Sequence, residues 1–166
     1  MKSNLLLALF FVTQLCSAQI SFQKYYGNDS LHHYIRKIIQ TSDGGYALIG
    51  ILQQITPVLM SPEMLIIRLD QSGDTLWTRT LGDSLEDQLM DILQTPDGGF
   101  VLAGQTTSFT PGWDQIVLIK MDSTGNLLWS KHYGGVGTDI CRKILLTENN
   151  GFQLIGNTTS FGTGGL

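Results

Sequence analysis

The sequence predicts an all-β protein built from tandem four-stranded antiparallel meanders. Two observations support this class. First, the chain repeats itself: Trp77 and its surroundings recur at Trp129, which is 129 − 77 = 52 residues later. Second, the apolar residues form short runs bounded by turn residues, rich in β-branched and aromatic side chains, with no helical stripe. These patterns indicate repeated sheets rather than helices.

The first 18 residues are typical of a cleaved signal peptide. Lys2 is followed by the apolar stretch 5–12 and by the small residues Ser17-Ala18. The apolar stretch is far shorter than the ~20 residues of a membrane-spanning helix. We therefore expect cleavage after Ala18, a secreted or outer cell-surface protein and no transmembrane segment. A lipoprotein anchor on Cys16 is the alternative, although residues 13–15 lack the small residue expected before a lipidated cysteine.

The charge balance disfavours polyanionic partners. Without residues 1–18 the chain has nine basic and fourteen acidic residues, so 9 − 14 gives a formal charge of −5. We expect no basic patch, and hence no nucleic acid and no anionic membrane as partner. Cys141 is then the single remaining cysteine, and its neighbours Ile140 and Ile144 predict a buried structural thiol.

Two motifs define the repeat. Thr-x-Asp-Gly-Gly-aromatic occurs at 41–46 and 95–100, and recurs as Thr-Glu-Asn-Asn-Gly-Phe at 147–152. Asp-x-x-Gly-x-x-x-Trp occurs at 70–77 and 122–129. The first motif predicts a two-residue hairpin turn with positive φ at both central positions, and the second a turn before a tryptophan that packs between neighbouring sheets. The predicted structural residues are Asp43, Gly44, Gly45, Asp70, Gly73, Trp77, Asp97, Gly98, Gly99, Asp122, Gly125 and Trp129.

Each unit is expected to contain four strands, named a to d in chain order. In the second copy they fall near residues 88–95, 100–106, 115–122 and 127–133. Several runs are apolar on both alternating sets, so both sheet faces should be buried by stacking of successive sheets.

This pattern predicts an incomplete β-propeller of about two and a half blades with an N-terminal extra strand. The predicted divisions are a d-type strand at 19–27, repeat 1 at 28–81, repeat 2 at 82–133 and a partial repeat 3 at 134–166. Since a closed propeller takes about four to eight blades, we expect a fragment of a longer protein.

The two motifs together resemble the tandem β-propeller repeats of large proteins secreted by Bacteroidetes-type bacteria. The resemblance extends from Phe22 to the end of the chain. Such proteins often end in a type IX secretion sorting domain, which this sequence lacks. The stretch 122–129 is also similar to the tryptophan-docking motif of quinoprotein dehydrogenase propellers, although a turn and a packing tryptophan explain the same residues.

Candidate binding residues lie in the longer connections between strands. The b–c and d–a connections vary between copies, whereas the a–b and c–d turns are tight, so we place a site on the former. Phe109, Trp113 and Asp114 are the candidates, as an aromatic pair beside a carboxylate suits sugar stacking. The alternative is that both aromatic residues only cap the loop.

Other residue groups suggest weaker sites. Asp70, Ser72 and Asp74 resemble half a calcium loop, but a hairpin turn explains them better. His32-His33 fits a surface loop better than a metal site. The acidic residues of 83–87 are expected to be a solvated loop. His132 and Cys141 should be too far apart for catalysis.

These observations predict no catalytic residue, metal or cofactor in this chain. The first functional hypothesis is a non-catalytic binding scaffold for an extracellular glycan or protein. The alternative is a propeller domain of a carbohydrate-active or redox enzyme whose catalytic residues lie outside this chain.

Overall fold

The computed structural model describes residues 23, 24, 26, 31–54, 63–82, 86–108 and 113–161. These residues form ten strands and no helix. The strands are β1 (Leu31–Gln40), β2 (Tyr46–Gln54), β3 (Glu63–Leu69), β4 (Thr75–Leu81), β5 (Asp87–Gln94), β6 (Phe100–Thr106), β7 (Gln115–Met121), β8 (Leu127–Tyr133), β9 (Asp139–Leu146) and β10 (Phe152–Thr158).

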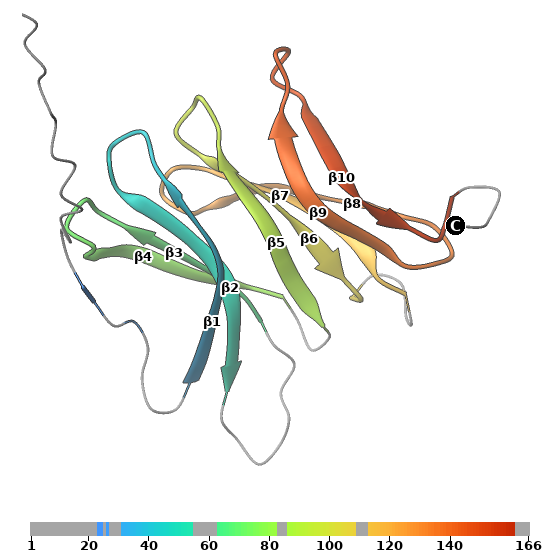
Figure 1. Cartoon of the computed structure of the whole chain (residues 1–166), viewed down its shortest axis with the longest axis horizontal. Coiled ribbons are helices and arrows are strands. Elements are labelled where there is room, and N and C mark those ends of the chain that lie inside the picture. Colours follow the sequence, from blue (N-terminus) through green and yellow to red (C-terminus); the bar gives the residue numbers. More distant parts are fainter. Residues whose placement is uncertain are drawn as a thin grey trace, which may run out of the picture.

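The strands form three antiparallel sheets arranged as an open, propeller-like row (Figure 1). Blade 1 has the order β1-β2-β3-β4, blade 2 the order β5-β6-β7-β8, and blade 3 consists of β9 and β10. The strands of the second copy begin and end within one residue of their predicted limits. The all-β meander architecture predicted from the repeat is thus confirmed.

The meander topology gives each blade two different ends. The a–b and c–d turns lie at one end, which we call the turn end, and the b–c and d–a connections lie at the other, which we call the loop end (Figure 1). The two kinds of candidate site therefore lie at opposite ends. Asp70 of the calcium-like loop is at the turn end of blade 1, while the sugar-stacking candidates Trp113 and Asp114 are at the loop end of blade 2.

The a–b turns differ from the predicted two-residue form. The amide of Thr41 donates to the carbonyl of Gly45 and the amide of Gly44 to that of Thr41, both at 2.9 Å, so the loop has three residues. Only its last residue has positive φ: 83° at Gly44 and 57° at Asn150 in the third copy. This is the hairpin whose final left-handed residue forms a bulge. The expectation of two positive-φ residues was wrong, because the turn is one residue longer.

In blades 1 and 2 the aspartate of the a–b turn is bound to a buried cation on the third strand. Asp43 pairs with Arg68, which is 4% exposed, and Asp97 pairs with Lys120, which is 8% exposed. Sequence reasoning assigned both aspartates to the turns alone. The signal was present in the repeat, since Arg68 and Lys120 each stand two residues before the aspartate of the c–d turn.

The c–d turns are closed by their own aspartates. Asp70 Oδ1 accepts from the amides of Ser72 and Asp74, both at 2.8 Å. Gly73 follows with φ of 78°, as the motif predicts. Asp122 makes the equivalent bonds in blade 2, so this aspartate is a turn residue in both copies.

Tryptophans join successive blades, as predicted. The rings of Trp77 and Phe100 meet edge to face with centroids 6.0 Å apart, and Trp77 Nε1 donates to the carbonyl of Ser123 in blade 2. Trp129 packs on Phe152 of blade 3 at 6.4 Å. The core lies between the blades, and its largest cluster combines β2 and β3 of blade 1 with β5, β6 and β7 of blade 2.

The N-terminal strand predicted at 19–27 lies mostly outside the described residues. Of that segment, Gln23, Lys24 and Tyr26 are described and none is assigned to a strand. Lys24 pairs with Asp74, and Tyr26 donates from its hydroxyl to the carbonyl of Gly73 at 2.7 Å. Both contacts are to the c–d turn of blade 1.

Candidate functional site at the loop end of the blades

The predicted sugar-stacking residues are partly visible at the loop end. Phe109 lies outside the described residues, whereas Trp113 is 44% exposed. Asp114 beside it is held in place, because its carbonyl accepts from the amide of Asp139 at 2.8 Å and its carboxylate from Gln105 Nε2 at 3.3 Å. The Oε1 atom of Gln105 is buried and accepts no hydrogen bond from the described residues. Trp113 is therefore an exposed ring on a fixed backbone where blades 2 and 3 meet.

Three further apolar side chains are exposed at the same end of the blades. Tyr133 at the end of β8 is 44% exposed, Val136 in the following connection 88%, and Phe161 after β10 66%. Phe161 occupies the position of Phe109, since 161 − 109 = 52. Sequence reasoning missed it, although the run Thr-Thr-Ser-Phe at 106–109 recurs unchanged at 158–161. Such aromatic residues offer contact area to a partner at low entropic cost.

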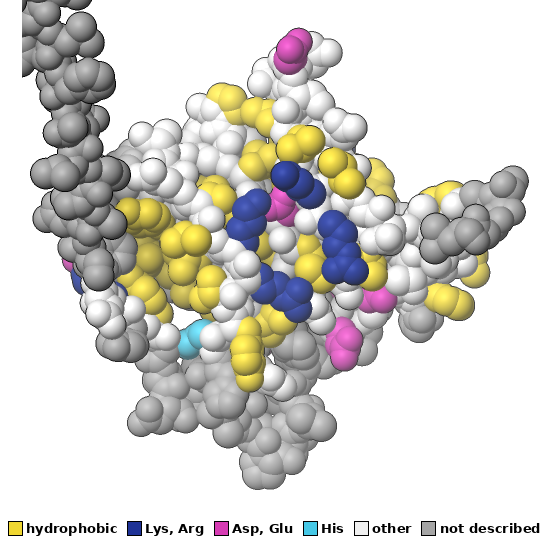
Figure 2. All heavy atoms as spheres, viewed as in Figure 1, with side chains coloured by type: hydrophobic (Ala, Val, Ile, Leu, Met, Phe, Trp, Pro, Cys, Tyr) yellow, Lys and Arg dark blue, Asp and Glu magenta, His cyan; other side chains and the backbone are white. Residues whose placement is uncertain are grey.

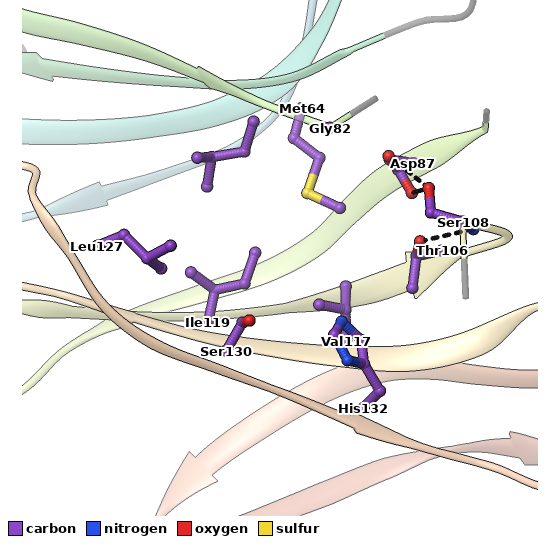
Figure 3. A pocket seen from close by; sticks show the side chains of 11 residues that line it. Met64, Gly82, Asp87, Thr106, Ser108, Val117, Ile119, Leu127, Ser130 and His132 are labelled. Atoms are coloured by element: carbon purple, nitrogen blue, oxygen red, sulfur yellow. Dashed lines mark hydrogen bonds between the residues drawn. The ribbon is translucent and has the colours of Figure 1, made fainter. Parts of the chain in front are cut away.

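A pocket of about 230 Å³ opens between the outer strands of blades 1 and 2 (Figure 3). Its wall is mainly apolar, with a few polar groups. The lining residues are Met64, Leu81, Gly82, Asp87, Thr106, Ser108, Val117, Ile119, Leu127, Ser130 and His132. Such a mixture is typical of small-molecule sites, although this volume is below the ~300 Å³ at which they usually begin.

The pocket contains two serines, a histidine and an aspartate, and one of the serines, Ser108, is hydrogen-bonded directly to the aspartate. Ser108 Oγ donates to Asp87 at 3.0 Å, and in Figure 3 these two side chains meet at one end while the His132 ring lies beside Val117. In a catalytic triad the serine donates to the histidine rather than to the aspartate. Burial lowers the pKa of His132, with the charge of Asp87 opposing this.

The bond between Ser108 and Asp87 is a structural element of the repeat. In blade 3, Asp139 accepts from Ser160 and Thr158 in the same arrangement, and Ser160 N donates to Thr158 Oγ1 at 3.1 Å as Ser108 N does to Thr106 Oγ1. Asp87 is only 2% exposed. The expectation of a solvated loop at 83–87 was therefore wrong for Asp87, because its carboxylate ties the start of strand a to the end of strand b.

His132 and Cys141 belong to different interfaces. His132 lines the pocket between blades 1 and 2, whereas Cys141 is fully buried in the cluster between blades 2 and 3. Burial also raises the pKa of the Cys141 thiol. The prediction of a structural thiol is confirmed.

Carboxylates at the turn end have strongly lowered pKa values with structural causes. Hydrogen bonds from Thr41 and from the amide of Gly45, together with Arg68, lower the pKa of Asp43 to about 2. In Asp122 the amide of Asn126 and the hydroxyl of Thr124 lower the pKa to about 2. These groups stay ionised at neutral pH and hold turns.

The described part of the chain offers neither a metal-binding cluster nor a membrane-spanning helix. There, no group of three or more His, Cys, Asp or Glu side chains is placed to hold a metal ion. Within the same residues no helix has the length and apolar character needed to cross a membrane. No protein-family model matches the chain, and no curated protein matches its sequence.

Proposed function

We propose that this chain is a secreted or cell-surface, non-catalytic repeat scaffold that binds an extracellular glycan or protein at the loop end of its blades. Export follows from the signal peptide expected at residues 1–18, with cleavage after Ala18. The resemblance to propeller repeats secreted by Bacteroidetes-type bacteria supports the same compartment.

The observation that carries this proposal is the exposed ring of Trp113 on a fixed support. Asp114, the residue after it, is bound to blade 3 through its backbone and to Gln105 through its side chain. An aromatic residue that is already positioned loses little entropy on binding, and tryptophan is frequent among residues that dominate binding energy. Phe161 and Val136 extend the apolar surface at this end.

The test is a binding screen of the full chain against glycans and extracellular surface proteins. For a ligand found in this way, Trp113→Ala should weaken the affinity about tenfold, equivalent to ~1.4 kcal/mol. Leu76→Ala is the matched control, because Leu76 is a similarly exposed apolar residue, 55% exposed, on the outer strand of blade 1. The choice of the loop end is wrong if Trp113→Ala leaves binding unchanged while a substitution of Asp97 or Gly98 abolishes it without unfolding the protein.

A further inference from the structure

The innermost strands of the three blades carry an unequal distribution of charge. In β1, β5 and β9 the ladder contains a bulge at equivalent positions, occupied by Arg36, Met90 and Arg142. The next residue is Lys37 in blade 1 and Lys143 in blade 3. Blade 2 has Asp91 there instead. Two arginine-lysine pairs therefore flank one aspartate across neighbouring blades.

The carboxylate of Asp91 is buried and fully bonded within the protein. It is 2% exposed, forms an ion pair with Lys37, and accepts from the amide of Ile144 in blade 3 at 2.9 Å. Its other hydrogen bond comes from the adjacent amide of Ile92, also at 2.9 Å. This carboxylate thus joins all three blades and neutralises Lys37.

The other three cations have no acidic partner among the described residues. Arg36 is exposed and donates to neutral groups, Gln88 Oε1 at 2.7 Å and Met90 Sδ at 3.2 Å. Arg142 and Lys143 are exposed, and neither side chain forms an ion pair or hydrogen bond with another described residue. Their charges remain available to a ligand.

We call the side chains of Arg36, Lys37, Arg142 and Lys143 the inner basic face; Figure 2 shows Lys and Arg side chains gathered around an acidic one over these strands. Four cations and the carboxylate of Asp91 give 4 − 1 = +3 here. The whole chain carries −4, so the remainder carries −7. The expectation that no basic patch exists was wrong, because net charge conceals residues that the fold brings together.

We propose that the inner basic face binds an anionic glycan, an oligosaccharide that carries carboxylate or sulfate groups. Guanidinium groups bind such oxyanions through two parallel hydrogen bonds, and a lysine adds a point charge. A nucleic acid duplex carries a charge about every 1.7 Å and would extend beyond the face over the acidic remainder of the protein. A saccharide whose negative charges are widely spaced can place a few of them on the inner basic face, which is small and has a net charge of +3. The choice of a glycan depends on the proposed extracellular function, whereas the basic face itself does not.

The experiment measures binding of the full chain to immobilised dextran sulfate and polygalacturonate, with neutral dextran, a single-stranded oligonucleotide and anionic vesicles as comparisons. The anionic glycans should bind best, and binding should fall steeply between about 0.05 and 0.5 M salt. Lys143→Gln and Arg142→Gln should each weaken binding about three- to tenfold. The matched control is Lys131→Gln, which removes the same charge from an exposed lysine on β8 and should change binding less than about twofold.

Four results would overturn the proposal. One is equal binding to neutral dextran, and another is an equal loss in Lys131→Gln and Lys143→Gln. The third is tighter binding to the oligonucleotide or to the vesicles than to either anionic glycan. Binding that depends on Trp113 but not on Lys143 would refute the inner basic face and leave the loop-end function standing. Anionic-glycan binding that depends on Lys143 but not on Trp113 would support the inner basic face, and the loop end is then judged by its own ligand screen.

Discussion

Blades 2 and 3 have equivalent first and second strands, but the side chains on these strands are buried to very different degrees. Val101 and Ala103 of β6 are fully buried, whereas their counterparts on β10, Gln153 and Ile155, are exposed, Ile155 by 47%. Blade 2 is covered by blade 1 on one face and by blade 3 on the other. Among the described residues, blade 3 is covered by blade 2 only. Burial in this fold is therefore a property of the interface between repeats rather than of a single repeat.

The largest expected effect comes from the phenylalanine that begins the second strand of blades 2 and 3. Phe100 is fully buried against Trp77, so Phe100→Ala should reduce the free energy of unfolding by about 3–5 kcal/mol. Phe152 is only partly buried against Trp129, and Phe152→Ala should cost about 1–2 kcal/mol. Urea denaturation of both variants measures the difference. Equal losses would show that blade 3 is as well supported as blade 2.

The next largest difference in stability is expected from substitution of the second glycine of the a–b turn, Gly99 in blade 2 and Gly151 in blade 3. A Cβ atom at Gly99 would lie 2.4 Å from the carbonyl oxygen of Met121 and 2.5 Å from Lys120 Nζ, whereas one at Gly151 would meet only Thr147 Oγ1, at 3.0 Å. We expect Gly99→Ala to cost about 2 kcal/mol or more, and Gly151→Ala to stay within about 0.5 kcal/mol.

Thermal melts of the two variants, followed by circular dichroism, make this measurement. The Thr147 hydroxyl can rotate away from a new methyl group, while the carbonyl of Met121 is fixed in the sheet. A stable Gly99→Ala variant would mean that blade 2 can separate its second and third strands at little cost.

The smallest effect should be the pH dependence of the turn carboxylates. Hydrogen bonds from Thr95, Lys120 and the amide of Gly99 hold the pKa of Asp97 well below its ordinary value of 3.8. A carboxyl whose pKa is lowered by folding stabilises the protein fully above that ordinary value, and the stabilisation is lost as the pH falls below it. Asp97→Asn should therefore cost about 1 kcal/mol at neutral pH, a modest value because the side chain is 61% exposed, and less at about pH 2.

Urea denaturation at several pH values tests this, with Asn149→Ala as the counterpart in blade 3. Asn149 stands at the position of Asp97 and has no carboxylate to titrate, so its substitution should leave the pH profile unchanged. A cost for Asp97→Asn that does not vary with pH would contradict the assigned role of the ion pair with Lys120.

Local sequence determined where the strands and turns of this protein begin and end. The strand limits of the second copy, the c–d turns and the packing of Trp77 and Trp129 between blades all follow from turn residues and apolar runs that act over a few positions. The repeat made these predictions stronger, because the same physical requirement is visible more than once. The length of the a–b turn was missed, since Asp-Gly suits hairpins of two or three loop residues.

Only the tertiary structure decided which side chains meet. The pairs of Asp43 with Arg68 and of Asp87 with Ser108 join residues that lie 25 and 21 positions apart, and the inner basic face joins two blades that are not adjacent in sequence. Trp113 is exposed, and the residue that binds the adjacent Asp114, Asp139, belongs to the next repeat. Long-range contacts of this kind depend on the stacking of whole sheets, because a residue's neighbours across an interface are set by the relative placement of the blades and not by the strand that carries it.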